Sequence, residues 1–368
     1  MGNKNELNFF SCHHGGIHSV KNHNLVKIDF SSNINPLGMS KKVIKSLTEN
    51  INLSYIYPDP KCIELKKDIL KHLDSNIVEI DQIVTGNGAT ELIHYFASTF
   101  VKKKVIIPSP TFCEYELASR RNSAKVIHSK VKEDFQIDSE FIVKKGNNPN
   151  NGITTIFLCN PNNPTGKDSK KQIIEILEKI NDKIIILLDE SYVEFIIDGD
   201  KKRYNYFINL IKEYNNVVIL RSLTKTCGLA GLRIGYAIAD KKKIEKMKNK
   251  VIAWNVNGLA QIAAREALKD KNYLNSAKKI IEIEKKRSFK MLKKNDKIKP
   301  ICTNVNFYLI EILNNKSSTE ITNTLLFKNN LLVRDCKTFI GMNDKFIRVA
   351  IKTPRENNEL FKALKMAL

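Results

Sequence analysis

Apolar residues recur along the chain with two spacings, and each spacing predicts one type of element. In 41–50 and 64–73 an apolar residue returns every three or four positions, which is typical of a helix with one buried face. Other apolar residues stand together in short runs, whose length is typical of strands covered on both faces. These runs occupy 104–108, 154–160, 184–190 and 217–223. Because segments with helical spacing, such as 171–180, alternate with these runs, the sequence predicts an α/β fold with a mostly parallel sheet.

The two ends of the chain differ from this alternating middle. Residues 1–38 are rich in His, Asn and Gly and contain no long periodic element, so we expect an N-terminal arm there. Residues 39–264 carry the alternation and should form a large domain. Long helical segments, followed by strands predicted at 306–312 and 346–351, indicate that residues 265–368 form a smaller α+β domain.

The composition excludes several classes of protein. The 368 residues are 42% hydrophobic, and the longest apolar runs fall far short of a membrane-spanning helix. The first residues lack the apolar core of a signal peptide, so we expect a cytoplasmic protein. Lys and Arg number 61 against 39 Asp and Glu, a net charge of +22. Only ten of the basic residues are Arg, and the Lys residues are spread over the whole chain. We therefore interpret the charge as a solvated surface that attracts small anions, and we expect no nucleic-acid partner.

Seven cysteines are scattered along the chain without a C-x-x-C pair. They are Cys12, Cys62, Cys113, Cys159, Cys227, Cys302 and Cys336. This pattern predicts neither a disulfide framework nor a zinc site built from cysteines. Cys12 stands close in sequence to His13, His14, His18 and His23, and the spacing of His14 and His18 is permissible for zinc. Histidines in a polar loop are common without a metal, and we expect no metal site.

Four polar segments stand near the ends of predicted strands, where open α/β sheets place their functional residues. The first, GNGATE at 86–91, precedes a helix and is either a tight turn or a phosphate cradle of free backbone N–H groups. It is not a dinucleotide fingerprint, because residue 91 is Glu where that motif needs Gly. The second, NPNNPTG at 160–166, is either a rigid turn or a site that holds a polar group.

The third and fourth segments carry charged groups. DESY at 189–192 ends the most apolar strand with Asp189, a carboxylate that needs a cationic partner unless it caps a helix. RSLTK at 221–225 ends another strand with Lys225, and a lysine held in a pocket can lose its proton and attack a carbonyl. Donors suited to a phosphate follow nearby: Ser222, Thr224 and Arg233. Together the four segments supply the protein's share of pyridoxal 5'-phosphate (PLP) chemistry: a phosphate cradle, an acid for the ring nitrogen and an amine for the aldehyde.

The ordered set of motifs resembles the fold-type I PLP enzymes, the aspartate aminotransferase superfamily. The motifs are YPDP at 57–60, GNGATE, NPNNPTG, DESY, SLTK with GLRIG, and a late Arg in FIRVA. Three further stretches are similar to the threonine-phosphate decarboxylase family within the histidinol-phosphate aminotransferase branch. They are His14-Gly15-Gly16, DFSSNINPLG at 29–38, and LVRDC at 332–336 followed by Phe339. The resemblance implies a mostly parallel seven-stranded sheet in α/β/α layers, a smaller α+β C-terminal domain, and an N-terminal arm that reaches the active site.

The resemblance also implies a role for each site residue. Lys225 would form the Schiff base with PLP, and Asp189, Asn163 and Tyr192 would contact the cofactor ring. The remaining cofactor contacts would be Phe112 on the ring face and Gly88, Ala89, Thr90, Ser222, Thr224 and Arg233 at the phosphate, with Tyr57 contributed by the partner subunit of a homodimer. Arg348 would bind the substrate carboxylate, and Arg334, His14 and Asn33 the substrate phosphate. The implied reaction is decarboxylation of L-threonine O-3-phosphate to (R)-1-aminopropan-2-yl phosphate for the cobalamin linker. The alternative is transamination, either of histidinol phosphate or by another type of class I/II aminotransferase.

Overall fold

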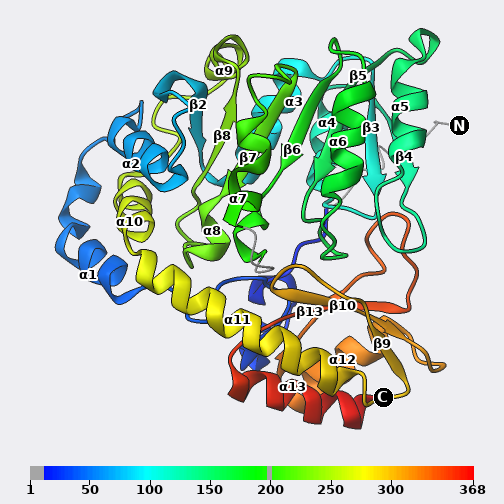
Figure 1. Ribbon diagram of the computed structural model, residues 1–368. Coiled ribbons are helices and arrows are strands. Elements are labelled where there is room, and N and C mark those ends of the chain that lie inside the picture. Colours follow the sequence, from blue (N-terminus) through cyan, green and yellow to red (C-terminus); the bar gives the residue numbers. More distant parts are fainter. Residues whose placement is uncertain (1–11, 197–200) are drawn as a thin grey trace, which may run out of the picture.

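A seven-stranded sheet forms the centre of the large lobe in the computed structural model, which describes residues 12–196 and 201–368 (Figure 1). Its strand order is β2-β8-β7-β6-β5-β3-β4. The strands span Ile83–Gly86 (β2), Lys104–Ser109 (β3), Lys125–Lys130 (β4), Ile153–Cys159 (β5), Ile185–Asp189 (β6), Val217–Ser222 (β7) and Gly235–Ala239 (β8). Strand β8 runs antiparallel to β2 and β7, and all pairs from β7 to β4 are parallel. The predicted α/β fold with a mostly parallel sheet is therefore confirmed.

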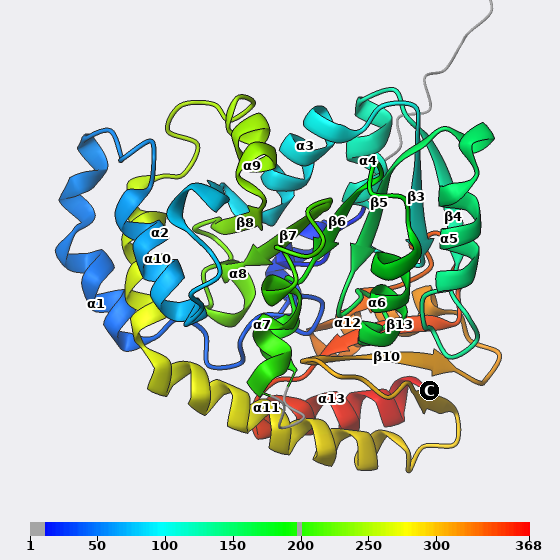
Figure 2. The ribbon, with the colours of Figure 1, turned by 45° about the horizontal axis from the view of Figure 1, so that its top comes forward.

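Helices cover both faces of this sheet, as Figures 1 and 2 show. Side chains alternate along β6, so that Ile186 and Leu188 enter one core while Leu187 enters the other. The first core includes residues of α2, α5, α6, α7 and α10, and the second includes residues of α3, α4 and α9. The helices of this lobe span Lys41–Glu49 (α1), Ile63–Leu73 (α2), Gly88–Phe100 (α3), Glu114–Arg121 (α4), Ser139–Asn147 (α5), Lys170–Lys179 (α6), Lys201–Asn209 (α7), Leu223–Thr226 (α8), Lys241–Lys248 (α9) and Gly258–Lys269 (α10). Burial on both faces is why each central strand reads as an uninterrupted apolar run.

A smaller lobe packs below the sheet in the view of Figure 1. Its four strands have the antiparallel order β12-β13-β10-β9. The elements span Ile298–Pro300 (β9), Phe307–Ile312 (β10), Arg334–Asp335 (β12), Phe346–Ala350 (β13), Lys271–Leu292 (α11), Ser318–Asn329 (α12) and Pro354–Ala367 (α13). The N-terminal arm joins this lobe, because β1 (Ile28–Asp29) pairs in parallel with β11 (Leu331–Leu332) and Phe30 lies in the core of the lobe.

Local sequence signals account for where several helices begin. Helices α12 and α13 both start with a capping box, formed by Ser317 with Glu320 and by Thr353 with Glu356. Short 3₁₀ turns connect other elements at Ile17–Ser19, His23–Leu25, Ile51–Tyr55, Ile80–Gln82, Pro149–Asn151 and Val193–Phe195. The predicted domain limits at residues 39 and 265 stay predictions; position 264 lies within α10, and α11 is the first helix of the smaller lobe.

The sequence predicts no disulfide framework, and the structure contains a single disulfide that the sequence did not indicate. Cys12 and Cys113 are joined by a disulfide although they lie 101 positions apart. The other cysteines are free, and of these Cys302 alone is exposed. No local spacing connects Cys12 with Cys113, so only the tertiary arrangement reveals the pair.

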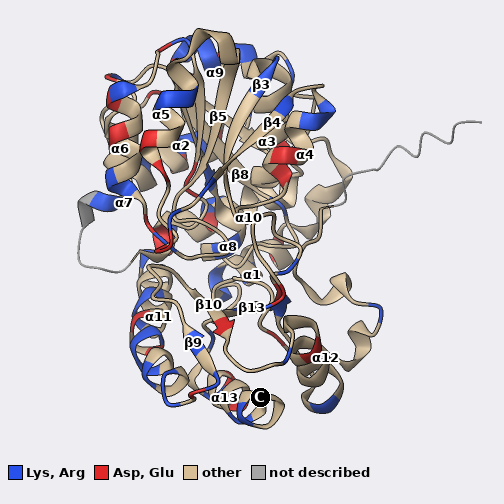
Figure 3. Cartoon of the chain, turned by 90° about the vertical axis from the view of Figure 1, so that its right-hand side faces the viewer, with Lys and Arg blue, Asp and Glu red and all other residues tan. Residues whose placement is uncertain are grey.

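Basic residues are distributed over both lobes rather than gathered on one element. Figure 3 shows Lys and Arg on α5, α7, α9, α11 and α13, which lie in different parts of the molecule. Within the described parts of the chain, every helix is too short or too polar to cross a membrane.

Candidate active site

A cavity of about 460 Å³ lies where β6 and β7 end and is also lined by the arm and the smaller lobe. Most of the predicted site residues line it together: His14, Asn33, Ala89, Thr90, Phe112, Asn163, Asp189, Tyr192, Ser222, Thr224, Lys225, Arg233, Arg334 and Arg348. Gly88 is the first residue of α3, directly before Ala89. Tyr57 is the exception, because it lies outside the cavity of its own chain. The residues come from segments far apart in sequence. The pairing of β6 with β7 brings Asp189 and Lys225 together.

The cavity floor pairs an amine with a buried carboxylate. Lys225 lies in α8, directly after β7, and its Nζ is 4.8 Å from the ring centroid of Tyr192. Asp189 is the last residue of β6 and is buried. Its Oδ2 accepts a hydrogen bond of 2.8 Å from the hydroxyl of Tyr115, and its Oδ1 accepts one of 2.8 Å from the backbone N–H of Ser191. Burial, followed by the negative charge of Asp189, raises the pKa of Tyr115 well above its usual range, so this hydroxyl stays a donor.

An anion cradle lies at the N-terminus of α3. Gly88 has φ +81°, and a Cβ at this position would collide with the guanidinium of Arg233, so the two groups are closely packed. Burial lowers the pKa of Arg233. Its guanidinium donates to the backbone oxygen of Ala230 over 3.1 Å and forms no ion pair with a described carboxylate. The hydroxyls of Ser222 and Thr224 lie 2.7 Å apart beside it. A half-buried cation, a helix N-terminus and two hydroxyls suit the phosphate of a cofactor.

A second cation lies deeper, where the smaller lobe meets the sheet. Arg348 on β13 is buried and donates hydrogen bonds to Oδ1 of Asn163 and to the backbone oxygen of Ser31. Its Nε has no partner in the described structure, and neither has Oδ1 of the buried Asn33. The amide of Asn33 donates to the hydroxyl of Tyr192 over 3.3 Å. Buried polar atoms without partners are costly, so this end of the cavity is arranged to receive a polar ligand.

Two arginines face each other across neighbouring strands at this end. Arg334 on β12 is the register partner of Arg348 on β13. Burial, followed by the positive charge of Arg348, lowers the pKa of Arg334. Like charges opposite each other on adjacent strands are unfavourable, and an anion bound between them removes that cost. Arg334 also donates from Nη2 to the backbone oxygen of His13 over 2.7 Å and to the hydroxyl of Thr338 over 2.8 Å, which ties the arm to this lobe.

A buried carboxylate that the sequence analysis did not single out holds the arm over the cavity. Glu114, on α4, lies 3.0 Å from Nε2 of His14 through one oxygen and 3.0 Å from Nε2 of His94 through the other. Burial alone would raise the pKa of Glu114, but the two histidines outweigh it and lower the pKa to about 2. Glu114 and Tyr115 lie in the segment PSPTFCEY at 108–115, but neither stands at the end of the strand predicted at 104–108. No spacing rule therefore pointed to them.

The ends of β6 and β7 are fixed by a second buried network. Glu190 accepts from Arg221 over 2.7 Å and from Arg203 over 3.1 Å. Arg203 also contacts Asp168 over 2.8 Å, after the NPNNPTG turn. These ion pairs turn Arg221 away from the cavity and hold the two strand ends, with Asp189 and Lys225, in place.

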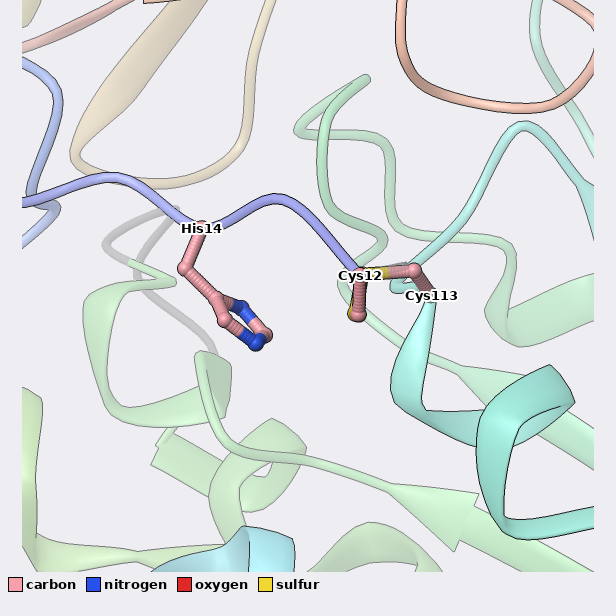
Figure 4. Close-up of side chains that lie close together, drawn as sticks. All are labelled: Cys12, His14 and Cys113. Carbon is pink, nitrogen blue, oxygen red and sulfur yellow. A yellow bond between two sulfur atoms is a disulfide. The ribbon is translucent and has the colours of Figure 1, made fainter. Parts of the chain in front are cut away.

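The cysteine and histidines of the arm, for which we expected no metal site, are only partly brought together. His18 and His23 lie beside each other with ring centroids 5.4 Å apart. The group of potential metal ligands found among the described residues is a different one, formed by Cys12, His14 and Cys113 with ligand atoms within 4.8 Å of one another (Figure 4). Its two sulfurs are joined to each other in the disulfide, and a disulfide sulfur, unlike a thiolate, is a poor zinc ligand.

A family model for aminotransferase class I and II matches residues 26–364, nearly the whole chain. The chain belongs to this family. PLP is therefore its cofactor, and the donors at the cavity fit it: an amine, a carboxylate and an anion cradle. The predicted fold-type I architecture is confirmed as well.

Relatives of this aminotransferase class I and II protein carry two different names. A protein of Caldanaerobacter subterraneus named "Putative threonine-phosphate decarboxylase" is 33% identical over 358 residues, 96% of this chain and 93% of the relative. A histidinol-phosphate aminotransferase of Methanocaldococcus jannaschii is 33% identical over 351 residues, 94% of this chain and 90% of the relative. The crystal structure of the histidinol-phosphate aminotransferase from Clostridium acetobutylicum superposes with a TM-score of 0.83 at 34% identity, covering 92% of this chain and 98% of the other. The two names come with equal sequence identity, so overall likeness does not separate decarboxylation from transamination.

Proposed function

We propose that this protein is a PLP-dependent decarboxylase of L-threonine O-3-phosphate, which releases CO₂ and (R)-1-aminopropan-2-yl phosphate for cobalamin biosynthesis. The observation that carries the proposal is the facing pair of Arg334 and Arg348 at one end of the cavity. L-Threonine O-3-phosphate is a short molecule with a carboxylate and a phosphate only a few bonds apart. Two guanidiniums on adjacent strands match such closely spaced anions.

Each cation has a distinct neighbourhood and so a distinct role. Arg348 is buried beside Asn163 and keeps an unpartnered Nε, which suits a carboxylate. Arg334 donates to the backbone oxygen of His13 and shares the cavity wall with His14, which suits the larger and more highly charged phosphate. Together they hold both ends of the substrate.

Holding both ends fixes the rotation of the substrate about Cα, and we propose that this rotation selects the bond that breaks. When bound, PLP supplies an electron sink for the bond broken at Cα. Asp189, held by Tyr115 and Ser191, supplies the negative charge at the cavity floor. Lys225 is the lysine that lines the cavity, and its amine is placed to carry a proton at Cα.

One purified sample tests the proposal against the alternative. We expect stoichiometric CO₂ from L-threonine O-3-phosphate without any keto acid, and little glutamate from histidinol phosphate with 2-oxoglutarate. The opposite result, in which only the reaction with keto acid proceeds, would assign the protein to the aminotransferases. Lys225→Ala, tested with both substrate pairs, controls for a contaminating enzyme.

We also propose that two copies of the chain share their active sites. Tyr57 has 79% of its side chain exposed and stacks on Trp254 at 4.5 Å. Tyr55, at 84%, and Ile252, at 65%, are exposed as well. A cluster of aromatic and aliphatic side chains of this size is rarely left exposed to water. A second copy of the chain that covers the cluster would bring Tyr57 to the anion cradle of that copy.

Mixing two defective variants tests this shared site. Lys225→Ala and Tyr57→Ala should each be weakly active, yet a mixed dimer keeps one cavity with both residues intact. Random exchange of equal amounts should restore about a quarter of the wild-type activity. Activity that stays at the sum of the two separate variants would show that Tyr57 does not act across an interface.

A further inference from the structure

The disulfide between Cys12 and Cys113 joins two walls of the cofactor cavity. Cys12 directly precedes His13 and His14 of the arm, and Cys113 directly follows Phe112, and all of these except Cys12 line the cavity. Figure 4 shows the arm crossing from His14 to Cys12, where it meets the beginning of α4 at Cys113. The bond therefore ties the arm to the large lobe at the mouth of the site.

We propose that Cys12 and Cys113 are a redox-modification site, at which a small-molecule disulfide such as glutathione disulfide closes the arm over bound PLP. The Cα atoms of the two residues lie 5.6 Å apart, within the range of disulfide-bonded cysteines. Both residues are partly exposed, whereas four of the five free cysteines are buried. A soluble disulfide can therefore reach this pair.

The exchange proceeds in two balanced steps. One thiolate of the pair attacks glutathione disulfide, forms a mixed disulfide and releases one glutathione as thiolate. The second protein thiolate then attacks the mixed disulfide, which forms the Cys12–Cys113 bond and releases the second glutathione. The pair is oxidised by two electrons, two glutathione molecules are formed, and the two protons of the protein thiols go to the released thiolates.

Without the bond, the arm near the cavity is held by contacts that can open and close. Residues 12–16 form no strand. The contacts are His14 with Glu114 at 3.0 Å, the backbone oxygen of His13 with Arg334 at 2.7 Å, and the backbone N–H of Gly16 with Ser31 at 2.7 Å. His14 also packs against Phe112, with ring centroids 5.7 Å apart. The disulfide adds the one link that thermal motion does not break, so the oxidised arm stays across the mouth of the cavity.

The inference rests on PLP in this cavity and not on which substrate is used, so its test follows the release of PLP. The holoenzyme is equilibrated with reduced glutathione or with an excess of glutathione disulfide. Peptide mapping without reductant then identifies the linked cysteines, and release of PLP into hydroxylamine is followed by absorbance. Cys12→Ser and Cys113→Ser remove the bond, and Cys302→Ser removes the exposed cysteine elsewhere as a matched control.

We expect a Cys12–Cys113 peptide in the oxidised protein and PLP release slowed on the order of tenfold against the reduced protein. Cys12→Ser and Cys113→Ser should release PLP as fast as the reduced wild-type protein does, under both conditions. In glutathione disulfide, glutathione should be attached to the cysteine that remains. Cys302→Ser should behave as the wild type. Three results would overturn the proposal: no linked peptide in excess glutathione disulfide, a linked peptide with unchanged release, or a reduced protein that holds one Zn²⁺ on these thiols and resists oxidation.

Discussion

Replacing Arg334 by Gln tests whether this side chain recognises the substrate phosphate. In the structure, Nη2 of Arg334 is used by the backbone oxygen of His13 and by Thr338. Nε and Nη1 form no hydrogen bond within the described residues, so two donor nitrogens remain for a phosphate. A hydrogen bond to a charged group contributes about 1.5–3 kcal/mol, so the loss of two costs about 3 kcal/mol or more, on the order of a 150-fold decrease in kcat/KM.

The assay measures kcat/KM for CO₂ release from L-threonine O-3-phosphate and compares it with L-threonine, which lacks the phosphate. Arg334→Gln should lose activity only with the phosphorylated substrate. Arg334→Lys keeps the positive charge but lacks the planar set of guanidinium donors, so its kcat/KM should fall between those of Arg334→Gln and the wild type. Lys337→Gln removes one positive charge nearby without touching the cavity and should match the wild type. Stability should change little, because the substitution also removes the repulsion from Arg348.

A loss of less than about fivefold in Arg334→Gln, or an equal loss with both substrates, would refute the assignment of the phosphate to Arg334. The second outcome would show that the arginine supports the fold of the arm through His13, which is its other visible role. Urea unfolding of each variant separates these two cases.

The remaining predictions concern Lys225 and Tyr115 at the cavity floor, and Glu114, which holds the arm over the cavity. Lys225→Ala should still bind PLP through the cradle around Arg233, but turnover should collapse and borohydride should leave no covalent cofactor; near-normal turnover would exclude the assigned role. Tyr115→Phe removes the 2.8 Å hydrogen bond to Asp189 and should lower kcat about tenfold or more with little change in KM, and an unchanged kcat would make this hydroxyl structural. Because the pKa of Glu114 is lowered to about 2, its ionised form stabilises the fold above about pH 4.5, and this contribution is lost as the pH falls toward 2. The difference in unfolding free energy between wild type and Glu114→Gln should therefore shrink over that window, and a constant difference in urea titrations would contradict the argument.

The central sheet and the cavity floor were predictable from sequence because their signals are local. An apolar run of four to seven residues predicts a covered strand, and the polar residue that ends it predicts the functional edge. Asp189 ends β6, Lys225 lies in the short helix α8 that follows β7, and both line the cavity floor in the structure. The carboxyl ends of parallel strands share one edge of the sheet, and the pairing of β6 with β7 then brings these two residues together.

The partners of these residues were not predictable in the same way. Tyr115 and Glu114 lie at the start of a helix, with ordinary amphipathic surroundings. Their roles come from which strand or arm packs against that helix, and sequence spacing does not encode this. Cys12 and Cys113, 101 positions apart, are the extreme case. The same limit explains why the disulfide was missed.

Arg334 and Arg348 show most clearly what the sequence does not predict. Both residues were singled out, yet their pairing across two strands was not foreseen. They stand in short strands, β12 and β13, joined by a connection from Cys336 to Lys345. A shift of the register by one residue would turn one of the two guanidiniums to the opposite face of the sheet. The observed register places Arg334 opposite Arg348, and Cys336 and Phe339 are buried in the connection between the two strands. Phe339 also lines the cavity, and the guanidinium of Arg334 lies over its ring at 5.1 Å, so substitution of Phe339 should weaken phosphate recognition as substitution of Arg334 does.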